Sequence, residues 1–125
     1  MAENYKILVV EDNDFVRMQI AKFLTDAGHA VVESTDGDDA MVKLDKTIDL
    51  AVVDVRMAPV DGFEFIKSMR EFDMDIPVIL ATGDDDPDLL NDAAMLKVGA
   101  VLMKPVEKDR LINTVDRTMR KRARA

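Results

Sequence analysis

The stretch Leu50-Ala51-Val52-Val53 is apolar at all four positions and is followed directly by Asp54. A second run, Val78-Ile79-Leu80-Ala81, has the same character and is followed by Thr82-Gly83. Short runs of this kind are typical of central strands in a parallel sheet, because helices cover both faces of such a sheet. The two runs therefore predict buried parallel strands that end in polar residues.

On either side of these runs, short β-branched segments alternate with longer amphipathic segments. This alternation predicts strands joined by helical crossovers, since parallel strands cannot be joined by a tight turn. The predicted strands are residues 6–10, 30–34, 50–53, 77–81 and 100–103. The predicted helices are residues 14–27, 37–46 and 62–72, a fourth from Pro87 to just before Gly99, and a fifth that carries Leu111, Ile112, Val115 and Met119 and frays over residues 120–125. Five such units predict one α/β domain with a parallel sheet and helices on both of its faces.

Local signals mark the helix ends and the buried faces. Asn13 and Asp86 are candidate N-caps, and Gly28 is a candidate stop for the first helix. We expect an apolar stripe on the third helix, made of Phe65, Ile66, Met69 and Phe72. Five methionines lie inside predicted helices and are interpreted as flexible core residues: Met18, Met41, Met69, Met95 and Met119.

The composition narrows the functional classes. The chain has 125 residues, with 17 Lys and Arg against 25 Asp and Glu and a formal net charge of −8. Such an acidic chain is a poor direct ligand for nucleic acid or an anionic membrane, and it favours a cation or a basic partner. The absence of cysteine excludes disulfides, thiolate zinc sites and cysteine nucleophiles. The single histidine, His29, which we expect to be exposed in a turn, disfavours multi-histidine metal sites and Ser-His-Asp triads.

The two ends of the chain carry little sign of targeting. The first six residues lack the regions of a signal peptide, and no apolar run reaches the roughly 18 residues that a membrane helix needs. We therefore expect a cytoplasmic protein with no membrane insertion and a single domain over residues 1–125. Residues 117–125 form a basic helix end or tail, which suits a helix C-terminus, an acidic partner or the start of a linker to an output domain.

Polar residues follow four of the predicted strands. The first strand is followed by Glu11-Asp12-Asn13-Asp14, the third by Asp54, the fourth by Thr82-Gly83 and the fifth by Lys104-Pro105. In a doubly wound sheet, ligands bind outside the carboxyl ends of the strands, so these residues are expected to converge. Crowded carboxylates repel one another, and a hard cation such as Mg2+ relieves that repulsion. The pattern predicts a metal site beside a lysine and a hydroxyl group that contact an anionic ligand.

Each element also has a simpler interpretation. Asp12, Asn13 and Asp14 are favourable residues at the start of a helix, and Thr82 is a common strand residue whose hydroxyl bonds locally. Asp54 alone is an ordinary loop residue after a strand. The functional interpretation depends on finding all of them, each immediately after a different strand.

These residues in this order resemble the receiver domain of two-component response regulators over essentially the whole chain. The resemblance rests on Glu11-Asp12, on Asp54 with Met57 and Asp61-Gly62, on Ala81-Thr82-Gly83 and on Lys104-Pro105. It implies a single flavodoxin-like (βα)5 domain with strand order 2-1-3-4-5. It also implies a signalling protein, not an enzyme in the usual sense, that assists its own phosphorylation and dephosphorylation.

The resemblance further implies roles for individual residues. Asp54 accepts a phosphoryl group from a sensor histidine kinase or a histidine phosphotransfer protein, and the result is an altered contact with a downstream protein. Glu11, Asp12, Asp54 and the backbone carbonyl of Arg56 hold Mg2+. Thr82 and Lys104 contact the phosphoryl oxygens, and the Lys104-Pro105 bond resembles one that is often cis in the family.

The chain departs from the family pattern at Ala58 and Val101, and the segment over residues 99–104 is also about two residues shorter than the common form. Ala58 stands where a proline is usual, with Pro59 one residue later, so we expect a different loop path after Asp54. Val101 stands at the switch position, three residues before Lys104, where an aromatic residue is common. We therefore expect the signal to pass mainly through the fourth-strand loop and fourth helix, residues 82–97.

The loop charges allow two interpretations. Arg56 and Asp84 lie two residues after Asp54 and Thr82 and resemble the positions that tune phosphoryl lifetime, so an ion pair between them is a candidate gate for water. Alternatively they are solvated loop charges, because exposed ion pairs are weak. The acidic run over residues 84–88 is interpreted as a helix cap, with a second metal site as the alternative.

Two other classes of protein compete with the acceptor receiver. One is a receiver-like binding module that is never phosphorylated, which Ala58 and Val101 allow. The other is a small α/β enzyme: an aspartyl phosphatase, which requires an Asp where Arg56 stands, or a flavodoxin-like protein, which requires a neutral phosphate cradle where the chain has acids. A receiver cut from a longer regulator is a further alternative, although no DNA-binding motif follows Lys104.

Overall fold

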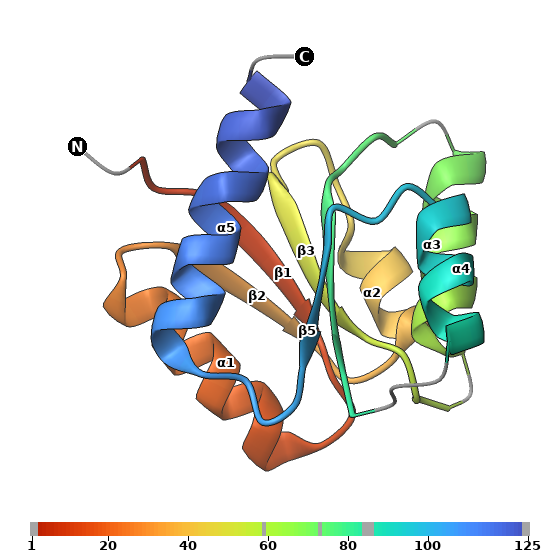
Figure 1. Ribbon diagram of the computed structural model, residues 1–125, viewed down its shortest axis with the longest axis horizontal. Helices are drawn as coiled ribbons and strands as arrows, with labels where there is room; N and C mark the ends of the chain where they lie inside the picture. Colours follow the sequence, from red (N-terminus) through yellow and green to blue (C-terminus); the bar gives the residue numbers. More distant parts are fainter. Residues whose placement is uncertain (1–2, 59, 73, 84–86, 124–125) are drawn as a thin grey trace.

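The computed structural model describes residues 3–58, 60–72, 74–83 and 87–123. Five strands form one parallel sheet in the order β2-β1-β3-β4-β5, as Figure 1 shows. The strands are β1 (Lys6–Val10), β2 (Ala30–Ser34), β3 (Leu50–Asp54), β4 (Val78–Thr82) and β5 (Ala100–Met103). The helices are α1 (Asp14–Asp26), α2 (Gly37–Lys43), α3 (Gly62–Glu71), α4 (Pro87–Met95) and α5 (Lys108–Ala123). The predicted flavodoxin-like fold and its strand order are confirmed.

The core has one layer on each face of the sheet because side chains alternate along every central strand. In β1, Ile7 and Val9 pack with α1 and α5, whereas Leu8 and Val10 pack with α2, α3 and α4. Strands β3 and β4 alternate in the same way, and all ten of their residues are buried. Burial on both faces explains why these strands are apolar almost throughout.

The helix starts and stops follow the predicted chemistry where the structure describes them. The Asn13 side chain accepts the Val16 N–H at 3.0 Å and caps α1, and Gly28 takes φ +96° directly after the helix ends. That φ value lies in the left-handed region, which glycine adopts without steric cost. The predicted cap Asp86 lies outside the described residues.

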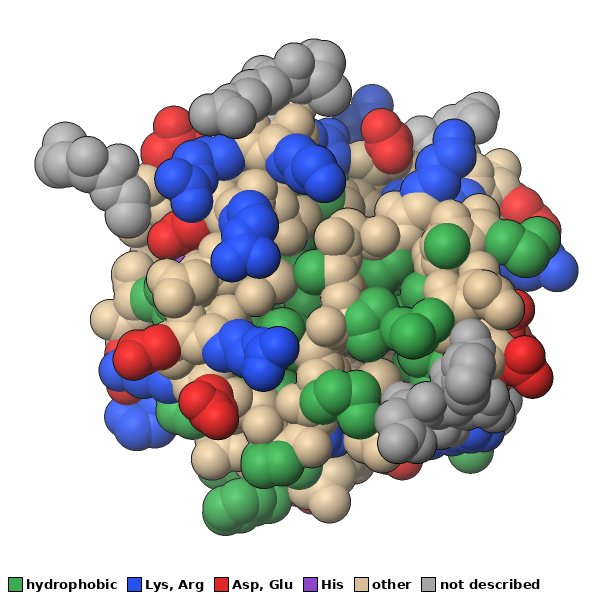
Figure 2. Space-filling view, in the orientation of Figure 1, with side chains coloured by type: hydrophobic (Ala, Val, Ile, Leu, Met, Phe, Trp, Pro, Cys, Tyr) green, Lys and Arg blue, Asp and Glu red, His purple; other side chains and the backbone are tan. Residues whose placement is uncertain are grey.

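Several predictions of burial are wrong. Met18 and Met95 are 64% and 81% exposed, and Phe72 is 71% exposed because α3 ends just before it. The predicted fraying of α5 is also wrong: the helix continues to Ala123, and Arg122 donates a hydrogen bond to the Asp75 carbonyl. Figure 2 shows Lys and Arg side chains gathered over α5. Helix α2 is shorter than predicted and ends at Lys43.

The exposed His29 of the sequence analysis is instead a buried residue with 6% exposure. Its Nδ1 accepts the Tyr5 N–H at 3.1 Å, and the two rings stack with their centres 5.5 Å apart. Burial lowers the pKa of His29, and the charge of Asp116 offsets part of that effect. The ring thus satisfies a backbone N–H at the amino edge of the sheet.

Candidate functional site

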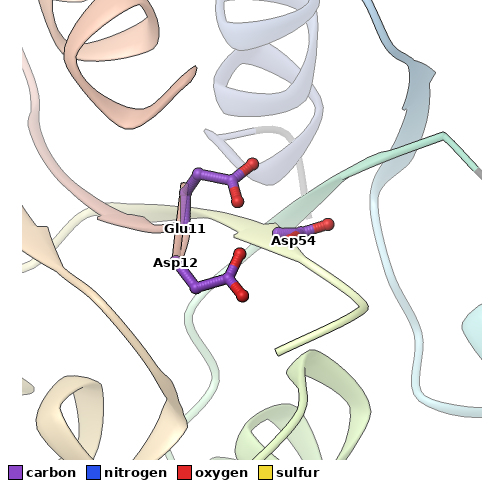
Figure 3. A group of neighbouring side chains, drawn as sticks. All are labelled: Glu11, Asp12 and Asp54. Atoms are coloured by element: carbon purple, nitrogen blue, oxygen red, sulfur yellow. The ribbon is translucent and has the colours of Figure 1, made fainter. Parts of the chain in front are cut away.

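Four strands bring the predicted residues to one edge of the sheet. Glu11 follows β1 directly, and Asp54 ends β3, the next strand in the sheet, where Val10 lies opposite Val53. Thr82 ends β4, and Lys104 follows β5. Because carboxyl ends of parallel strands share an edge, residues far apart in sequence become neighbours, as Figure 3 shows for the acids.

Three carboxylates form the acidic part of the site. Glu11 and Asp54 are only 1% and 5% exposed, whereas Asp12 is exposed. One oxygen from each of the three lies within 4.8 Å of the others. Desolvation, together with a hydrogen bond and the like charge of Glu11, raises the pKa of Asp12. A set of crowded oxygen donors fits a hard divalent cation, which prefers such ligands.

Lys104 balances part of this negative charge. Its Nζ lies 2.5 Å from Oε1 of Glu11 and 3.2 Å from Oδ1 of Asp54. Burial alone lowers the pKa of Lys104, but the hydrogen bond to Glu11 and the charge of Asp54 more than offset it, so the pKa is raised. The ammonium group therefore remains charged between two buried carboxylates. The peptide bond from Lys104 to Pro105 is cis, as the resemblance implied.

The acids and the lysine line an open hollow of about 620 Å³. Asn13, Val16, Arg56 and Gly83 complete its wall. Thr82 lies just beneath the surface with no exposure. Arg56 is exposed at the rim, and Asp84, its predicted partner in a water gate, lies outside the described residues. The acidic run over 84–88, interpreted as a cap, lies largely outside them too.

A glycine allows α3 to approach the end of β3. A Cβ built on Gly62 would lie 2.2 Å from the backbone oxygen of Asp54, a distance that no real side chain tolerates. The Gly62 N–H donates to the Val55 carbonyl at 2.9 Å, and the Asp61 side chain caps α3 by accepting the Glu64 N–H. The close approach fixes the backbone that presents Asp54.

The two departures from the family pattern have different surroundings. Val101 is partly buried and packs against the core layer that includes Leu89 and Ala93 of α4. Ala58 is exposed, and Pro59 lies outside the described residues. Val101 is therefore an apolar contact between β5 and the α4 side of the core.

One residue at the site was missed by the sequence analysis. Arg17 of α1 has a side chain that is only 13% exposed, and its Nη1 donates to the Glu11 carbonyl at 2.9 Å. The only sequence signal is the spacing of Asp14 and Arg17, which also form an ion pair. Such a pair is common on helix surfaces and does not by itself indicate a site.

Comparison with known proteins agrees with this geometry. Residues 7–116 match the family described as the response regulator receiver domain. Chemotaxis protein CheY of Bacillus subtilis is 27% identical over 92% of this chain and 98% of its own length. The CAI-1 autoinducer sensor kinase/phosphatase CqsS of Vibrio cholerae is 32% identical over 88% of this chain, which spans only 17% of that protein.

Solved structures give the same result. The Vibrio cholerae chemotaxis protein CheY4 superimposes with a TM-score of 0.87 at 28% identity and covers 93% of this chain and 99% of its own. Among the residues that the structure describes, none of the helices has the length and apolarity needed to cross a bilayer. From the match over residues 7–116, the fold and the strand order, the chain belongs to the response regulator receiver domain family.

Proposed function

We propose that the protein is a response regulator that accepts a phosphoryl group on Asp54 from a sensor histidine kinase or a histidine phosphotransfer protein. Receiver domains are signalling proteins that interact with sensor kinases and downstream targets. The observation that carries the proposal is the contact of Lys104 Nζ with Asp54 at 3.2 Å, in a hollow that Glu11 and Asp12 also line. One anionic ligand in this hollow could therefore contact a carboxylate nucleophile, a cation held by oxygen ligands, and a lysine.

The chemistry needs little beyond these groups. Transfer breaks the phosphorus–nitrogen bond of a phosphohistidine and forms a phosphorus–oxygen bond to Asp54. The main requirements are an aligned nucleophile and neutralisation of charge on the equatorial oxygens. Glu11, Asp12, Asp54 and the backbone carbonyl of Arg56 would hold Mg2+. When bound, Mg2+ supplies the charge neutralisation that three crowded carboxylates cannot.

Thr82 and Lys104 complete the phosphoryl site in this proposal. Lys104 exchanges its contacts with Glu11 and Asp54 for contacts with phosphoryl oxygens, because its ammonium group is a mobile point charge on a flexible stem. The Thr82 hydroxyl, at the end of the neighbouring strand, donates to another oxygen. The rim charges Arg56 and Asp84 are candidates for control of phosphoryl lifetime.

We further propose that the signal passes through residues 82–97. Helix α4 is anchored in the core by Leu89 and Ala93, which are 5% and 4% exposed, while Leu90 and Met95 point outward. Val101 packs against the same layer and is too small to act as an aromatic rotamer switch. A displacement that starts at Thr82 and Gly83 would therefore move α4 against Val101 and change the surface offered to a downstream protein.

We also propose that the protein is a single domain that acts in the cytoplasm. The domain spans residues 1–125, with residues 117–125 as its basic end, and the protein acts in the cytoplasm by protein contact. It neither binds nucleic acid directly nor inserts into a membrane. Its own contribution to catalysis is limited to assisting the gain and loss of the phosphoryl group on Asp54.

One incubation tests the acceptor role. The protein is treated with acetyl phosphate with and without Mg2+, and its intact mass is measured. We expect a gain of one phosphoryl group that requires Mg2+, disappears in Asp54→Asn and persists in Asp38→Asn, a control at an exposed aspartate of α2. A wild-type protein that gains no mass contradicts the acceptor role and favours a binding module that is never phosphorylated.

A further inference from the structure

Arg17 connects three parts of the structure behind the acidic site. Its Nη1 donates to the Glu11 carbonyl at 2.9 Å, its Nη2 to Oδ1 of Asp14 at 2.7 Å and its Nε to Oε1 of Glu33 at 3.3 Å. The acceptors belong to the loop after β1, the first turn of α1 and strand β2. The planar guanidinium group can donate to all three at once, whereas a lysine offers a single ammonium nitrogen.

The acceptor on Glu11 is the important one. This carbonyl belongs to the peptide group that joins Glu11 to Asp12, two of the three clustered carboxylates. Rotation of that peptide plane would turn both side chains. On the other side, the Glu11 N–H donates to the Ser34 carbonyl at 3.0 Å, and the Asn13 N–H donates to Oε2 of Glu11 at 3.2 Å. Arg17 thus fixes the one peptide group that orients both acids.

The burial of Arg17 separates it from an ordinary surface ion pair. Its side chain is 13% exposed, while the partner side chains of Asp14 and Glu33 are 80% and 45% exposed. A charge-assisted bond to a backbone carbonyl is stronger than a neutral one, and it is geometrically specific. The exposed carboxylates keep the buried guanidinium charge balanced while the carbonyl bond orients the loop.

We propose that Arg17 is a positioning residue for the metal site, holding Glu11 and Asp12 in the arrangement that binds Mg2+. The inference rests on the proposed function, in which these carboxylates are the ligands. Arg17 touches neither the metal nor the phosphoryl group; it acts through the Glu11 peptide. Groups that orient metal ligands from behind commonly control affinity strongly.

The direction in which Mg2+ affinity changes when Arg17 is replaced distinguishes a positioning role from a purely electrostatic role and from a purely structural role. Removing a positive charge near three carboxylates strengthens cation binding if charge alone matters. A purely structural arginine changes the free energy of unfolding and leaves Mg2+ affinity alone. A positioning arginine weakens Mg2+ binding when removed, even though the site becomes more negative.

In the test, Mg2+ alone is titrated into four metal-free proteins, and calorimetry measures the Mg2+ affinity of each. The four proteins are the wild type, Arg17→Gln, Arg17→Lys and Lys22→Gln. We expect about a tenfold loss of Mg2+ affinity in both Arg17 variants. Lysine should not rescue the affinity, because it keeps the positive charge but lacks the planar set of N–H donors of a guanidinium group. Lys22→Gln is the matched control, an exposed residue of the same helix that pairs with Asp26, and its affinity should equal that of the wild type. Thermal unfolding without Mg2+ verifies that each variant is folded at the titration temperature.

Amide exchange in the metal-free protein gives a second readout. We expect faster exchange at Asp12 and Asn13 in Arg17→Gln, with the central strands unchanged. Unchanged or stronger Mg2+ binding by folded Arg17 variants overturns the inference. A wild-type protein that does not bind Mg2+ contradicts the proposed function instead, and the amide exchange then decides alone: unchanged rates overturn the positioning role and faster rates support it.

Discussion

The two edges of the sheet use buried and partly buried polar side chains in opposite ways. At the carboxyl edge, Glu11, Asp54 and Lys104 interact with one another, so the charges depend on their partners. At the amino edge, His29 and Arg70 instead complete the hydrogen bonding of the backbone. The polar side chains of the amino edge therefore stabilise the fold. At the carboxyl edge, by contrast, like charges lie close together, an arrangement that by itself lowers stability.

The largest expected effect is at the carboxyl edge, where the backbone leaves no room. Gly62→Ala should lower the free energy of unfolding by about 3 kcal/mol, because α3 must move away from the Asp54 carbonyl. Gly83→Ala is the matched control, since among the described residues no atom outside its chain neighbours lies within 4 Å of its added Cβ. Urea unfolding of both variants measures the difference. Equal stability of the two variants would show that the α3 approach is adaptable.

The next effect belongs to the amino edge. Arg70 donates to the carbonyls of Met74, Ile76 and Leu96 at 3.2, 2.7 and 3.4 Å. Arg70→Met should lower the free energy of unfolding by about 2 kcal/mol, because three partly buried carbonyl groups lose their donor. Arg120→Met, which loses an exposed bond to the Asp116 carbonyl within α5, should be close to neutral in the same unfolding experiment. Mg2+ affinity should be unchanged in both, and a change in Arg70→Met would break the contrast between the edges.

A third change should stabilise the protein. Desolvation and the neighbouring Glu11 raise the pKa of Asp12, so the charged form is disfavoured in the folded state. This group favours folding at low pH, and that contribution disappears as the pH rises through its folded pKa. At neutral pH without Mg2+, Asp12→Asn should therefore raise stability by less than about 1 kcal/mol, since the side chain is exposed and screened.

With Mg2+ present, the wild type should instead be more stable than Asp12→Asn. Added Mg2+ should raise the melting temperature of the wild type by binding the folded state, and it should raise that of Asp12→Asn much less. Asp38→Asn, at an exposed aspartate of α2, serves as the control and should respond like the wild type. A metal-free Asp12→Asn protein that is less stable than the wild type contradicts the view that this edge carries unfavourable repulsion.

The smallest expected effect is the pH response of the amino edge. Burial lowers the pKa of His29 below its usual value of 6.5, with a partial offset from Asp116, so the folded state favours the neutral ring that accepts the Tyr5 N–H. This contribution to stability is complete above the unfolded pKa and is lost as the pH falls through the folded pKa. His29→Gln should show a shallower loss of stability between pH 7 and 5 in denaturant titrations. An equal or steeper loss in the variant would show that protonation of His29 does not contribute to the loss of stability in acid.

The sequence predicted the regular parts well because they follow from patterns of neighbouring residues. Alternation of apolar runs placed all five strands, and residues after those strands indicated the edge where Glu11, Asp54 and Lys104 meet. His29 and Arg17 were not predictable in this way. His29 accepts the backbone N–H of Tyr5, which lies in another segment, and Arg17 joins the Glu11 carbonyl to Glu33 of a different strand. Both environments therefore depend on tertiary packing that no local pattern records.

Side-chain burial on the helices was also only partly predictable. Met18, Phe72 and Met95 have helical spacing but lie outside the covered stripe, because the width of that stripe depends on how each helix sits on the sheet. Residues 59 and 84 lie outside the described residues. The altered loop path after Asp54 and the water gate between Arg56 and Asp84 therefore stay predictions.

Strand β5 gives the site a particular order of assembly. It lies at the end of the sheet and pairs with β4 alone, yet Lys104 directly follows it. During synthesis, the chain presents Glu11, Asp12 and Asp54 long before Lys104 has left the ribosome. We therefore expect the nascent sheet to carry uncompensated acids until its last strand docks, so that partial neutralisation of the site and completion of the sheet are the same late event.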